Sequence, residues 1–438
     1  MGSETIIIGG GLGGLCAAAL LAQRGQRVTL LERGSALGGR ARSQTEAGFT
    51  FNLGAHALYL GGPACTVLSE LGVSVGGKRA AGRGVYVERA GQLHALPQSP
   101  LGLLTSDLLT ARGKLQVMAL LATLGPRKER ALTGSNVRSW LDAATPDPSA
   151  RALLELLVRL TSYAHAPELL GAEMAARQLA IAVRRGVMYV DGGWQSLVDE
   201  VERRARSLGV RIELGCPVRN VAREAKGFTV SLDAGKDLHT DTVVAAVDPH
   251  ALARLLPDDP WAANCAAEAT PLRAACLDVG VHDLPHPERI NVLSLDAPVY
   301  YANHAAYAQV APAGAATLQL VRYLAPDEDG RGAEDELHAF LDRTQPGVLA
   351  RAASVRFLPS LTVHHDAPGR GRAGLVHPRY GSFYNVSDQA STVGVLLDGV
   401  LGAARQVADS VAGSVSDVRS RAKEVAALAT TRDDGAAA

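Results

Sequence analysis

The chain is poor in aromatic side chains, has no net charge and contains no long hydrophobic run. Phe, Trp and Tyr make up 4% of its 438 residues, so a binding site would be lined mainly by aliphatic side chains. Lys and Arg number 44, as do Asp and Glu, which leaves no basic excess for nucleic-acid binding. No segment approaches the roughly 20 apolar residues that cross a membrane. We therefore expect a soluble globular protein without a nucleic-acid partner.

The five cysteines are scattered, and no two of them form a Cys-x-x-Cys pair. This pattern is unlike a disulfide framework or a zinc site, and it favours a reducing compartment. The first strand is expected almost directly after Met1, which leaves no room for a signal peptide. The sequence thus predicts a cytoplasmic protein without a bound metal. Its length predicts two domains, and residues 419–438, rich in alanine and charge, are expected to be a flexible tail.

The N-terminal segment predicts a strand–helix–strand unit. Residues 5–8 are an apolar, β-branched run typical of a buried parallel strand. Residues 15–23 favour a helix with an apolar face, and residues 27–31 are typical of the next strand. The glycines between the first strand and the helix have the spacing G-x-G-x-x-G. In this context the spacing indicates dinucleotide binding rather than an ordinary turn.

Each glycine of this loop has an expected contact. Gly9 permits the tight turn, Gly11 lets the backbone approach a diphosphate, and Gly14 lets the helix lie close to the sheet. The helix N-terminus offers N–H groups and a partial positive charge to the phosphates. Glu32 ends the second strand at the distance expected for an acid on a ribose. An acid there favours a free 2′-hydroxyl, and hence FAD or NAD over NADP.

A second glycine pair, residues 38–39, precedes Arg40. It suits a loop that folds over a diphosphate and pairs the charge of the phosphates with a guanidinium, although a solvated surface loop is the alternative. Residues 49–56 then predict a strand that ends in Gly54-Ala55-His56, where small residues could lie against a flat ring system.

The runs Gly38-Gly39-Arg40 and Phe51-Asn52-Leu53-Gly54-Ala55-His56 resemble the flavin-containing amine oxidase superfamily, and within it the phytoene desaturase and carotenoid isomerase branch. The resemblance extends from residue 4 to about residue 415. It implies an α/β fold of the amine oxidase and p-hydroxybenzoate hydroxylase type, with a discontinuous Rossmann-like FAD-binding domain interleaved with an α+β substrate domain. The implied FAD-binding segments are 1–96, 187–255 and 370–418, and the implied substrate-binding segments are 97–186 and 256–369.

Three further positions take their expected role from this resemblance. It places the backbone of Val218 against the adenine, Asp388 at the ribityl and diphosphate groups, and the backbone near Leu396 at the pyrimidine oxygen of the flavin. Two departures from the family pattern stand out: Ser387 replaces a glycine and Asn52 replaces the usual aspartate. The C-terminal motif holds no cysteine, so FAD is predicted to be bound non-covalently.

His56 is the one ionisable side chain expected beside the flavin ring, either as a catalytic group or as a structural hydrogen-bond partner. The predicted cofactor-binding residues are Gly9, Gly11, Leu12, Gly13, Gly14, Glu32, Arg33, Gly39, Arg40, Gly54, Ala55, His56, Val218, Asp388 and Leu396.

The expected substrate domain carries leucines at helical spacing over residues 101–121, punctuated by Arg and Lys. They predict either ordinary amphipathic helices or a peripheral membrane-docking surface that admits a lipid-like substrate. Residues 274–281, 308–310 and 317–323 are typical of an antiparallel sheet, and residues 334–344 of a helix. The aromatic set Tyr300, Tyr301, His304, Tyr307 and Tyr323 could face a pocket or a sheet core. His364 and His365 are adjacent on an extended segment, so they should point in opposite directions and share no metal.

The predicted function is FAD-dependent oxidation or desaturation of an apolar, isoprenoid- or polyene-like substrate, with hydride transfer to N5 of the flavin. An oxygen-using amine or protoporphyrinogen-type oxidase is the alternative within enzymes. A non-catalytic lipid-binding protein similar to the Rab GDP-dissociation inhibitors is the alternative from another class. The sequence leaves the electron acceptor, the net reaction and the oligomeric state open.

Overall fold

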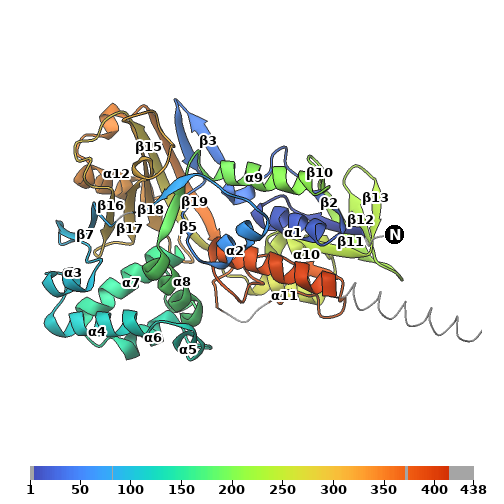
Figure 1. Ribbon diagram of the computed structural model, residues 1–438, viewed down its shortest axis with the longest axis horizontal. Helices are drawn as coiled ribbons and strands as arrows, with labels where there is room; N and C mark the ends of the chain where they lie inside the picture. Colours follow the sequence, from blue (N-terminus) through green and yellow to red (C-terminus); the bar gives the residue numbers. More distant parts are fainter. Residues whose placement is uncertain (1–3, 81, 370–372, 414–438) are drawn as a thin grey trace, which may run out of the picture.

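The computed structural model describes residues 4–80, 82–369 and 373–413, and within them the chain forms two lobes that lie side by side (Figure 1). One lobe is built on a five-stranded parallel sheet and the other on a seven-stranded mixed sheet. The chain enters each lobe more than once, so the predicted interleaving of two structural units is confirmed. The tail predicted at residues 419–438 lies outside the described residues.

The five-stranded sheet has the strand order β10-β2-β1-β14-β20, and every neighbouring pair is parallel. Its strands are β1 (Glu4–Ile8), β2 (Arg27–Leu31), β10 (Arg211–Glu213), β14 (Thr242–Ala245) and β20 (Phe383–Asn385). Helix α1 (Leu12–Gln23) connects β1 to β2 and confirms the predicted N-terminal unit. The sheet thus gathers three chain segments that are far apart in the sequence.

Both faces of this sheet are covered, which explains the uninterrupted apolar run of β1. Ile7 packs on one face against α1, α2 (Pro63–Glu70), α9 (Trp194–Ser207) and the helix of residues 396–413. Ile6 and Ile8 pack on the other face against an antiparallel three-stranded sheet and two helices. These elements are β11 (Val218–Arg223), β12 (Phe228–Leu232), β13 (Asp237–Thr240), α10 (Pro249–Leu255) and α11 (Pro260–Glu268). A strand buried on both faces has no polar side to present.

The seven-stranded sheet has the order β19-β15-β18-β17-β16-β7-β8. Its strands are β7 (Val85–Arg89), β8 (Gln92–Ala95), β15 (Leu272–Val281), β16 (Asn291–Ser294), β17 (Val299–Asn303), β18 (Ala316–Tyr323) and β19 (Ser354–His364). All pairs are antiparallel except β16 with β7. Helix α12 (Ala333–Thr344) covers one face, on which Tyr301 lies. Cys276 and Tyr323 lie on the opposite face, which packs against the helices described next.

Six helices form the lower part of this lobe (Figure 1): α3 (Pro100–Thr105), α4 (Ala111–Thr123), α5 (Pro126–Arg130), α6 (Val137–Ala144), α7 (Pro148–Ser162) and α8 (Ala172–Arg185). Their leucines divide between core and surface. Leu103 and Leu120 are buried, whereas Leu101, Leu104 and Leu115 are 71%, 53% and 64% exposed. No helix among the described residues is long and apolar enough to cross a membrane.

The remaining strands and the 3-10 turns are short. They are β3 (Ser43–Glu46) paired with β4 (Phe49–Asn52), the sheet of β5 (Leu58–Tyr59), β9 (Val187–Val190) and β6 (Gly77–Arg79), and the 3-10 turns η1 (Gly39–Ala41), η2 (His304–Ala306) and η3 (Leu349–Arg351).

Three details differ from the sequence-based expectations. Strands β7 and β8 pair within the seven-stranded sheet, although residues 1–96 were assigned to the FAD-binding segment. Helix α11 packs with the five-stranded sheet, although it follows the boundary at residue 255. Residues 308–310 form no strand: the N–H of Gln309 donates to Asp191, and the carbonyl of Val310 accepts from Thr50. In each case contacts with residues distant in the sequence, and not the local sequence pattern, decided where the segment lies.

Candidate functional site

A cavity of about 650 Å³ lies between the two sheets. Its volume is within the range of small-molecule and cofactor sites. The carboxyl ends of β1 and β2 open into one end, and strands β15, β18 and β19 of the seven-stranded sheet line the other. All fifteen predicted cofactor-binding residues lie on its walls. The structure therefore brings the predicted residues together, and their role in binding a cofactor remains a prediction.

The glycine loop between β1 and α1 has the geometry that its spacing predicts. Gly9 has a φ of +111°, and a Cβ there would lie 2.4 Å from the carbonyl oxygen of Ala246. A Cβ on Gly14 would lie 2.0 Å from the carbonyl oxygen of Gly9. A Cβ on Gly11 would meet no protein atom within 4 Å. Gly9 and Gly14 are therefore required by the fold, whereas Gly11 leaves space on the cavity side.

Glu32 ties the loop together at the end of β2. One of its carboxylate oxygens accepts the N–H of Gly10 at 2.6 Å, and the other accepts the N–H of Gly34 at 2.7 Å. Each oxygen retains a second lone pair for a ligand hydroxyl. Glu32 thus has a structural role in addition to the ribose contact that we predict for it.

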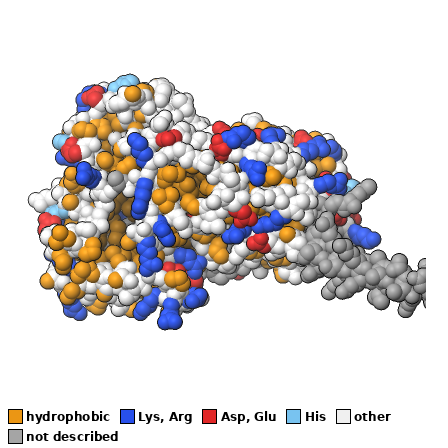
Figure 2. All heavy atoms as spheres, viewed as in Figure 1, with side chains coloured by type: hydrophobic (Ala, Val, Ile, Leu, Met, Phe, Trp, Pro, Cys, Tyr) orange, Lys and Arg blue, Asp and Glu red, His pale blue; other side chains and the backbone are white. Residues whose placement is uncertain are grey.

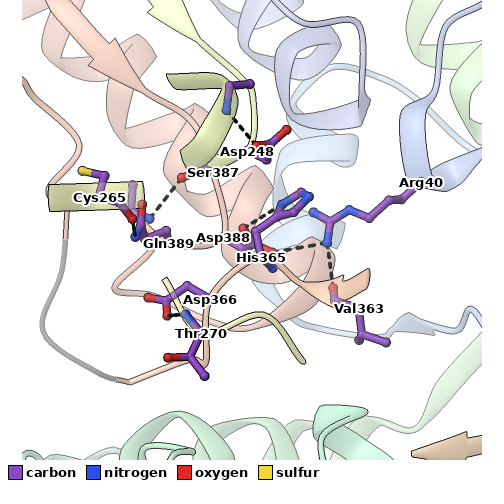
Figure 3. A network of polar contacts seen from close by, with 12 residues as sticks. Arg40, Asp248, Cys265, Thr270, Val363, His365, Asp366, Ser387, Asp388 and Gln389 are labelled. Atoms are coloured by element: carbon purple, nitrogen blue, oxygen red, sulfur yellow. Dashed lines mark hydrogen bonds and ion pairs between the residues drawn. The ribbon is translucent and has the colours of Figure 1, made fainter. Parts of the chain in front are cut away.

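Arg40 and Asp388 meet across the cavity wall (Figure 3). Nη1 of Arg40 lies 3.3 Å from the Asp388 carboxylate and donates to the carbonyl oxygen of Val363 at 2.6 Å. Asp388 also accepts the backbone N–H of His365 at 2.9 Å and faces Nδ1 of the same residue at 3.3 Å. Burial alone would raise the pKa of Asp388, but Arg40 and His365 outweigh it and hold the pKa well below its usual range. Asp388 is therefore ionised.

The two adjacent histidines point to different partners, as predicted. Nε2 of His364 lies 2.7 Å from the carbonyl oxygen of Ser162 in the buried core. His365 turns the other way and lines the cavity. Within the described ranges no cluster of three or more potential metal ligands occurs.

His56 is held as a neutral imidazole beside Trp194. Its Nδ1 lies 2.7 Å from the carbonyl oxygen of Gly54, and the two rings are 4.6 Å apart. Burial lowers the pKa of His56 to about 4, and the nearby charge of Arg40 lowers it further, while the hydrogen bond to Gly54 opposes both effects. A neutral imidazole at pH 7 is suited to hydrogen bonding or to accepting a proton, and the structure favours neither of the two predicted roles.

The remaining predicted residues lie at separate points of the wall. Val218 begins β11 at one end, beside Cys216 and Asp233. Leu396 begins the helix of residues 396–413 with a φ of +54°, a backbone conformation that is uncommon for a branched side chain. Strained residues of this kind cluster at functional sites.

Asn52 and Ser387, the two residues that depart from the family pattern, both accept hydrogen bonds from nearby groups. The side-chain oxygen of Asn52 accepts the N–H of Trp194 at 2.9 Å and the hydroxyl of Ser43 at 2.7 Å. An amide oxygen therefore does here what a carboxylate oxygen would do. The hydroxyl of Ser387 accepts the N–H of Ala390 at 3.3 Å, within its own turn.

The far end of the cavity is apolar. Ala274 and Cys276 of β15, Val321 of β18 and Leu361 of β19 line it, together with Tyr163. Burial raises the pKa of Cys276 well above its usual range and that of Tyr163 to about 12, so both groups are neutral.

The predicted aromatic set is divided between three places. Tyr300 and Tyr323 pack against Tyr163 behind this apolar end, at ring distances of 6.3 and 6.4 Å. Tyr301 faces α12 on the other side of the sheet. His304 and Tyr307 instead contact Tyr189, at 4.7 and 5.5 Å. None of the five lines the cavity itself within the described residues.

Asp398 is a cavity residue that the sequence analysis missed. It lies in the first turn of the helix of residues 396–413, is 2% exposed, and accepts the N–H of Ala64 at 2.9 Å. Burial raises its pKa to about 6, although the hydrogen bond from Ala64 opposes the shift. An aspartate within an apolar helix pattern was the available signal.

We expect Asp398→Asn to stabilise the protein at pH 7.5 but not at pH 4. The carboxyl has a pKa of about 6 when folded and about 3.8 when unfolded, so its favourable contribution is complete below pH 3.8 and is lost as the pH rises towards 6. At about 1.4 kcal/mol per pKa unit, the gain at pH 7.5 is about 2 to 3 kcal/mol. Urea unfolding at both pH values measures it, with the exposed Asp237→Asn as control. An equal change at both pH values would contradict the assignment.

The residues at the glycine-loop end fit the diphosphate of a flavin nucleotide. The N-cap of α1 is Gly11, whose missing side chain leaves the first-turn N–H groups without a side-chain acceptor. The unobstructed side of Gly11 and the guanidinium of Arg40 border the same cavity. Glu32 and Asp388 add hydrogen-bond acceptors for the hydroxyls of the sugar parts.

The chain is similar to known flavoenzymes in sequence and in fold. Residues 12–330 match the model of the flavin containing amine oxidoreductase family. Protoporphyrinogen oxidase of Bos taurus is 29% identical over 63% of this chain and 64% of its own length. Carotenoid 3,4-desaturase of Haloarcula japonica is 28% identical over 59% of this chain and 58% of its own. The chain thus matches somewhat less than two thirds of the length of these relatives.

The fold is shared with solved structures. An oxidoreductase from Methanosarcina mazei has a TM-score of 0.77, with 21% sequence identity over 93% of this chain and 100% of its own. At this identity the likeness shows the fold alone. The family match covers well over half of the chain and includes Gly14, the second glycine pair and Asn52 to His56. The chain therefore belongs to the flavin containing amine oxidoreductase family.

Proposed function

We propose that the protein binds FAD non-covalently and oxidises or desaturates an apolar, isoprenoid- or polyene-like substrate. The observation that carries the proposal is the single cavity that joins a phosphate-binding loop to an apolar sheet face. Bound FAD would supply a hydride acceptor at its N5. The chain supplies the anion-binding loop, a wall that excludes water and a neutral His56.

The apolar end of the cavity supports an apolar substrate. Its lining from β15, β18 and β19 offers a long molecule contact with aliphatic side chains. Each methylene that moves from water into such a site contributes about 0.8 kcal/mol, so a chain of several methylenes outweighs any single polar contact. The name of the Haloarcula japonica relative, a carotenoid desaturase, is consistent with such a substrate.

An amine substrate is the second candidate, and Asp398 is the observation that favours it. A cationic amine needs a carboxylate or an aromatic cage, and the cavity wall holds Asp398 with Tyr59, Tyr163 and Trp194. However, the carboxylate of Asp398 already accepts an N–H from the first turn of α2, which partly balances its charge. The glycine loop and Arg40, which we propose to bind the diphosphate of FAD, favour a desaturase or an amine oxidase over a non-catalytic lipid-binding protein.

The purified protein is expected to be yellow, and anaerobic addition of a polyene or prenyl lipid is expected to bleach the flavin. The test compares these substrates with primary and secondary amines, in the wild type and in Asp398→Asn. Acid precipitation should release the flavin to the supernatant. Bleaching by amines alone, lost in Asp398→Asn, would favour the oxidase instead. A colourless protein would contradict the cofactor, and colour in the pellet would contradict non-covalent binding.

We further propose that α3 and α4 contact a membrane surface from which the substrate enters. Figure 2 shows hydrophobic side chains gathered at this corner of the molecule, and Leu101, Leu104 and Leu115 are exposed there beside Arg112 and Lys114. Exposed leucines with cationic neighbours suit an anionic lipid surface. These helices do not line the described cavity, so we propose them as a docking surface and not as a gate of the cavity. In the bleaching assay, Leu101→Glu with Leu115→Glu should slow the reaction with substrate in anionic vesicles but not in detergent.

A further inference from the structure

His365 and Arg40 both contact the carboxylate of Asp388 (Figure 3). His365 follows directly after β19, and both of its donor groups face the Asp388 carboxylate: the backbone N–H at 2.9 Å from one oxygen and Nδ1 at 3.3 Å from the other. Because an ionised carboxylate can only accept, Nδ1 must carry the proton of this contact. The imidazole is thus turned towards Asp388 and not towards a metal.

Asp388 is too deeply buried to be balanced by solvent. Its side chain is 4% exposed, and its charge is offset by Arg40 and the backbone N–H of His365 at one oxygen and by Nδ1 of His365 at the other. Without these partners, burial would raise the pKa of the carboxyl. His365 therefore helps to keep Asp388 ionised and oriented.

The same strand end also orients Arg40. Nη1 of the guanidinium donates to the carbonyl of Val363, two residues before His365, and contacts Asp388. Its Nε and Nη2 make no hydrogen bond to the described residues. The side chain is 41% exposed and borders the cavity. One edge of the guanidinium is thus anchored, while the other is open to two oxygens of an anion such as a phosphate.

We propose that His365 is a positioning residue of the cofactor site: it holds Asp388, which in turn holds the Arg40 guanidinium with its open edge towards the cofactor diphosphate. This chain of hydrogen bonds, here called the relay, runs from Nδ1–H and N–H of His365 through the carboxylate of Asp388 to Nη1 of Arg40. Residues 40, 365 and 388 come from three distant segments, so no local motif contains it. The inference rests on the proposed binding of FAD.

A double-mutant cycle on FAD affinity tests the relay. His365→Leu removes the Nδ1 donor but keeps the backbone N–H, and we expect about threefold to tenfold weaker FAD binding to the apoprotein. Arg40→Ala alone is expected to weaken binding about tenfold to a hundredfold. If His365 acts through Arg40, His365→Leu should change the affinity by less than about twofold in the Arg40→Ala background.

Two further variants separate positioning from general stability. His365→Asn keeps a donor near the place of Nδ1 and is expected to bind FAD within about twofold of the wild type. His364→Gln changes the adjacent histidine, which faces Ser162 instead, and should leave FAD affinity unchanged even if it lowers the melting temperature. If His365→Leu does not fold, His365→Ala gives the same comparison.

Unchanged affinity in His365→Leu, or additive losses in the double mutant, would overturn the relay. Failure of the wild type to bind FAD would instead overturn the proposed function. The two failures are therefore distinguishable in one titration series.

Discussion

Gly11→Val is expected to fold normally and to lose most of its affinity for FAD. The backbone of Gly11, with φ −71° and ψ 172°, is open to any residue, and a Cβ there meets no protein atom within 4 Å. The fold therefore does not require glycine at this position. The added side chain would project on the cavity side, where we predict that the backbone approaches the diphosphate. Overpacking at such a contact costs about 1 to 3 kcal/mol, which corresponds to a loss of affinity from about fivefold to about 140-fold.

Titration of FAD into apoprotein, together with urea unfolding, measures both effects. Gly332→Ala is a matched control, because Gly332 is also an N-cap glycine with no atom within 4 Å of a Cβ, but it lies before α12. It should change neither quantity. Gly14→Ala should unfold the protein, since its Cβ would lie 2.0 Å from the carbonyl oxygen of Gly9. FAD affinity equal to that of the wild type in Gly11→Val would show that the diphosphate binds elsewhere.

The second large effect is expected at Arg356. This residue forms a buried ion pair with Asp278, whose side chain is fully buried and also accepts from Gln319 at 2.8 Å. Burial raises the pKa of Asp278 to about 6, although Arg356 and Gln319 oppose the shift. Arg356→Met leaves this carboxylate without its cation. We expect a loss of about 3 to 5 kcal/mol at pH 7.5, a large part of the total stability of a typical protein.

The position of Arg356 links this loss to the site. Its Nη2 donates to the carbonyl oxygen of Asn52 at 2.6 Å, and its guanidinium lies over the ring of Phe51. The chain continues from Asn52 directly into Gly54 to His56 on the cavity wall. Arg356 therefore fastens the seven-stranded sheet to the segment that borders the cavity.

Denaturant unfolding of three variants measures this contribution. The double variant Arg356→Met with Asp278→Asn should recover much of the loss, because no buried charge then lacks a partner. Arg351→Met removes an exposed pair with Asp283 and should cost less than about 1 kcal/mol. If Arg356→Met and Arg351→Met lose equal stability, burial of Asp278 does not decide the effect.

Structural elements that depend only on residues close together in the sequence were predicted correctly. The glycine loop, α1 and strands β1 and β2 agree with expectation, because turns, helix periodicity and strand patterns depend on near neighbours. Segments 274–281 and 317–323 likewise fall within β15 and β18. The family resemblance added positions such as Asp388, which no local pattern would have singled out.

The features that the sequence did not predict share one physical cause: each depends on contacts between residues that are far apart in the sequence. Strand β7 pairs with β16, about 200 residues later, and its own sequence does not reveal to which sheet it belongs. His365 was identified only as half of a histidine pair, since its partner Asp388 lies 23 residues away and Arg40 more than 300. Asp398 was not among the predicted site residues, since only its packing against α2 shows it to be a buried acid.

The amino-acid sequence by itself determined the glycine loop at which we predict a diphosphate site, because a strand, three spaced glycines and a helix N-terminus need only adjacent residues to form such a loop. The tertiary structure decided what surrounds that site: the apolar wall of β15, β18 and β19, the neutral state of His56, and the contacts of Asp388 with Arg40 and His365. Burial and charge pairing arise only when distant segments pack together. A carboxyl or imidazole therefore takes its charge state from the fold and not from its neighbours in sequence.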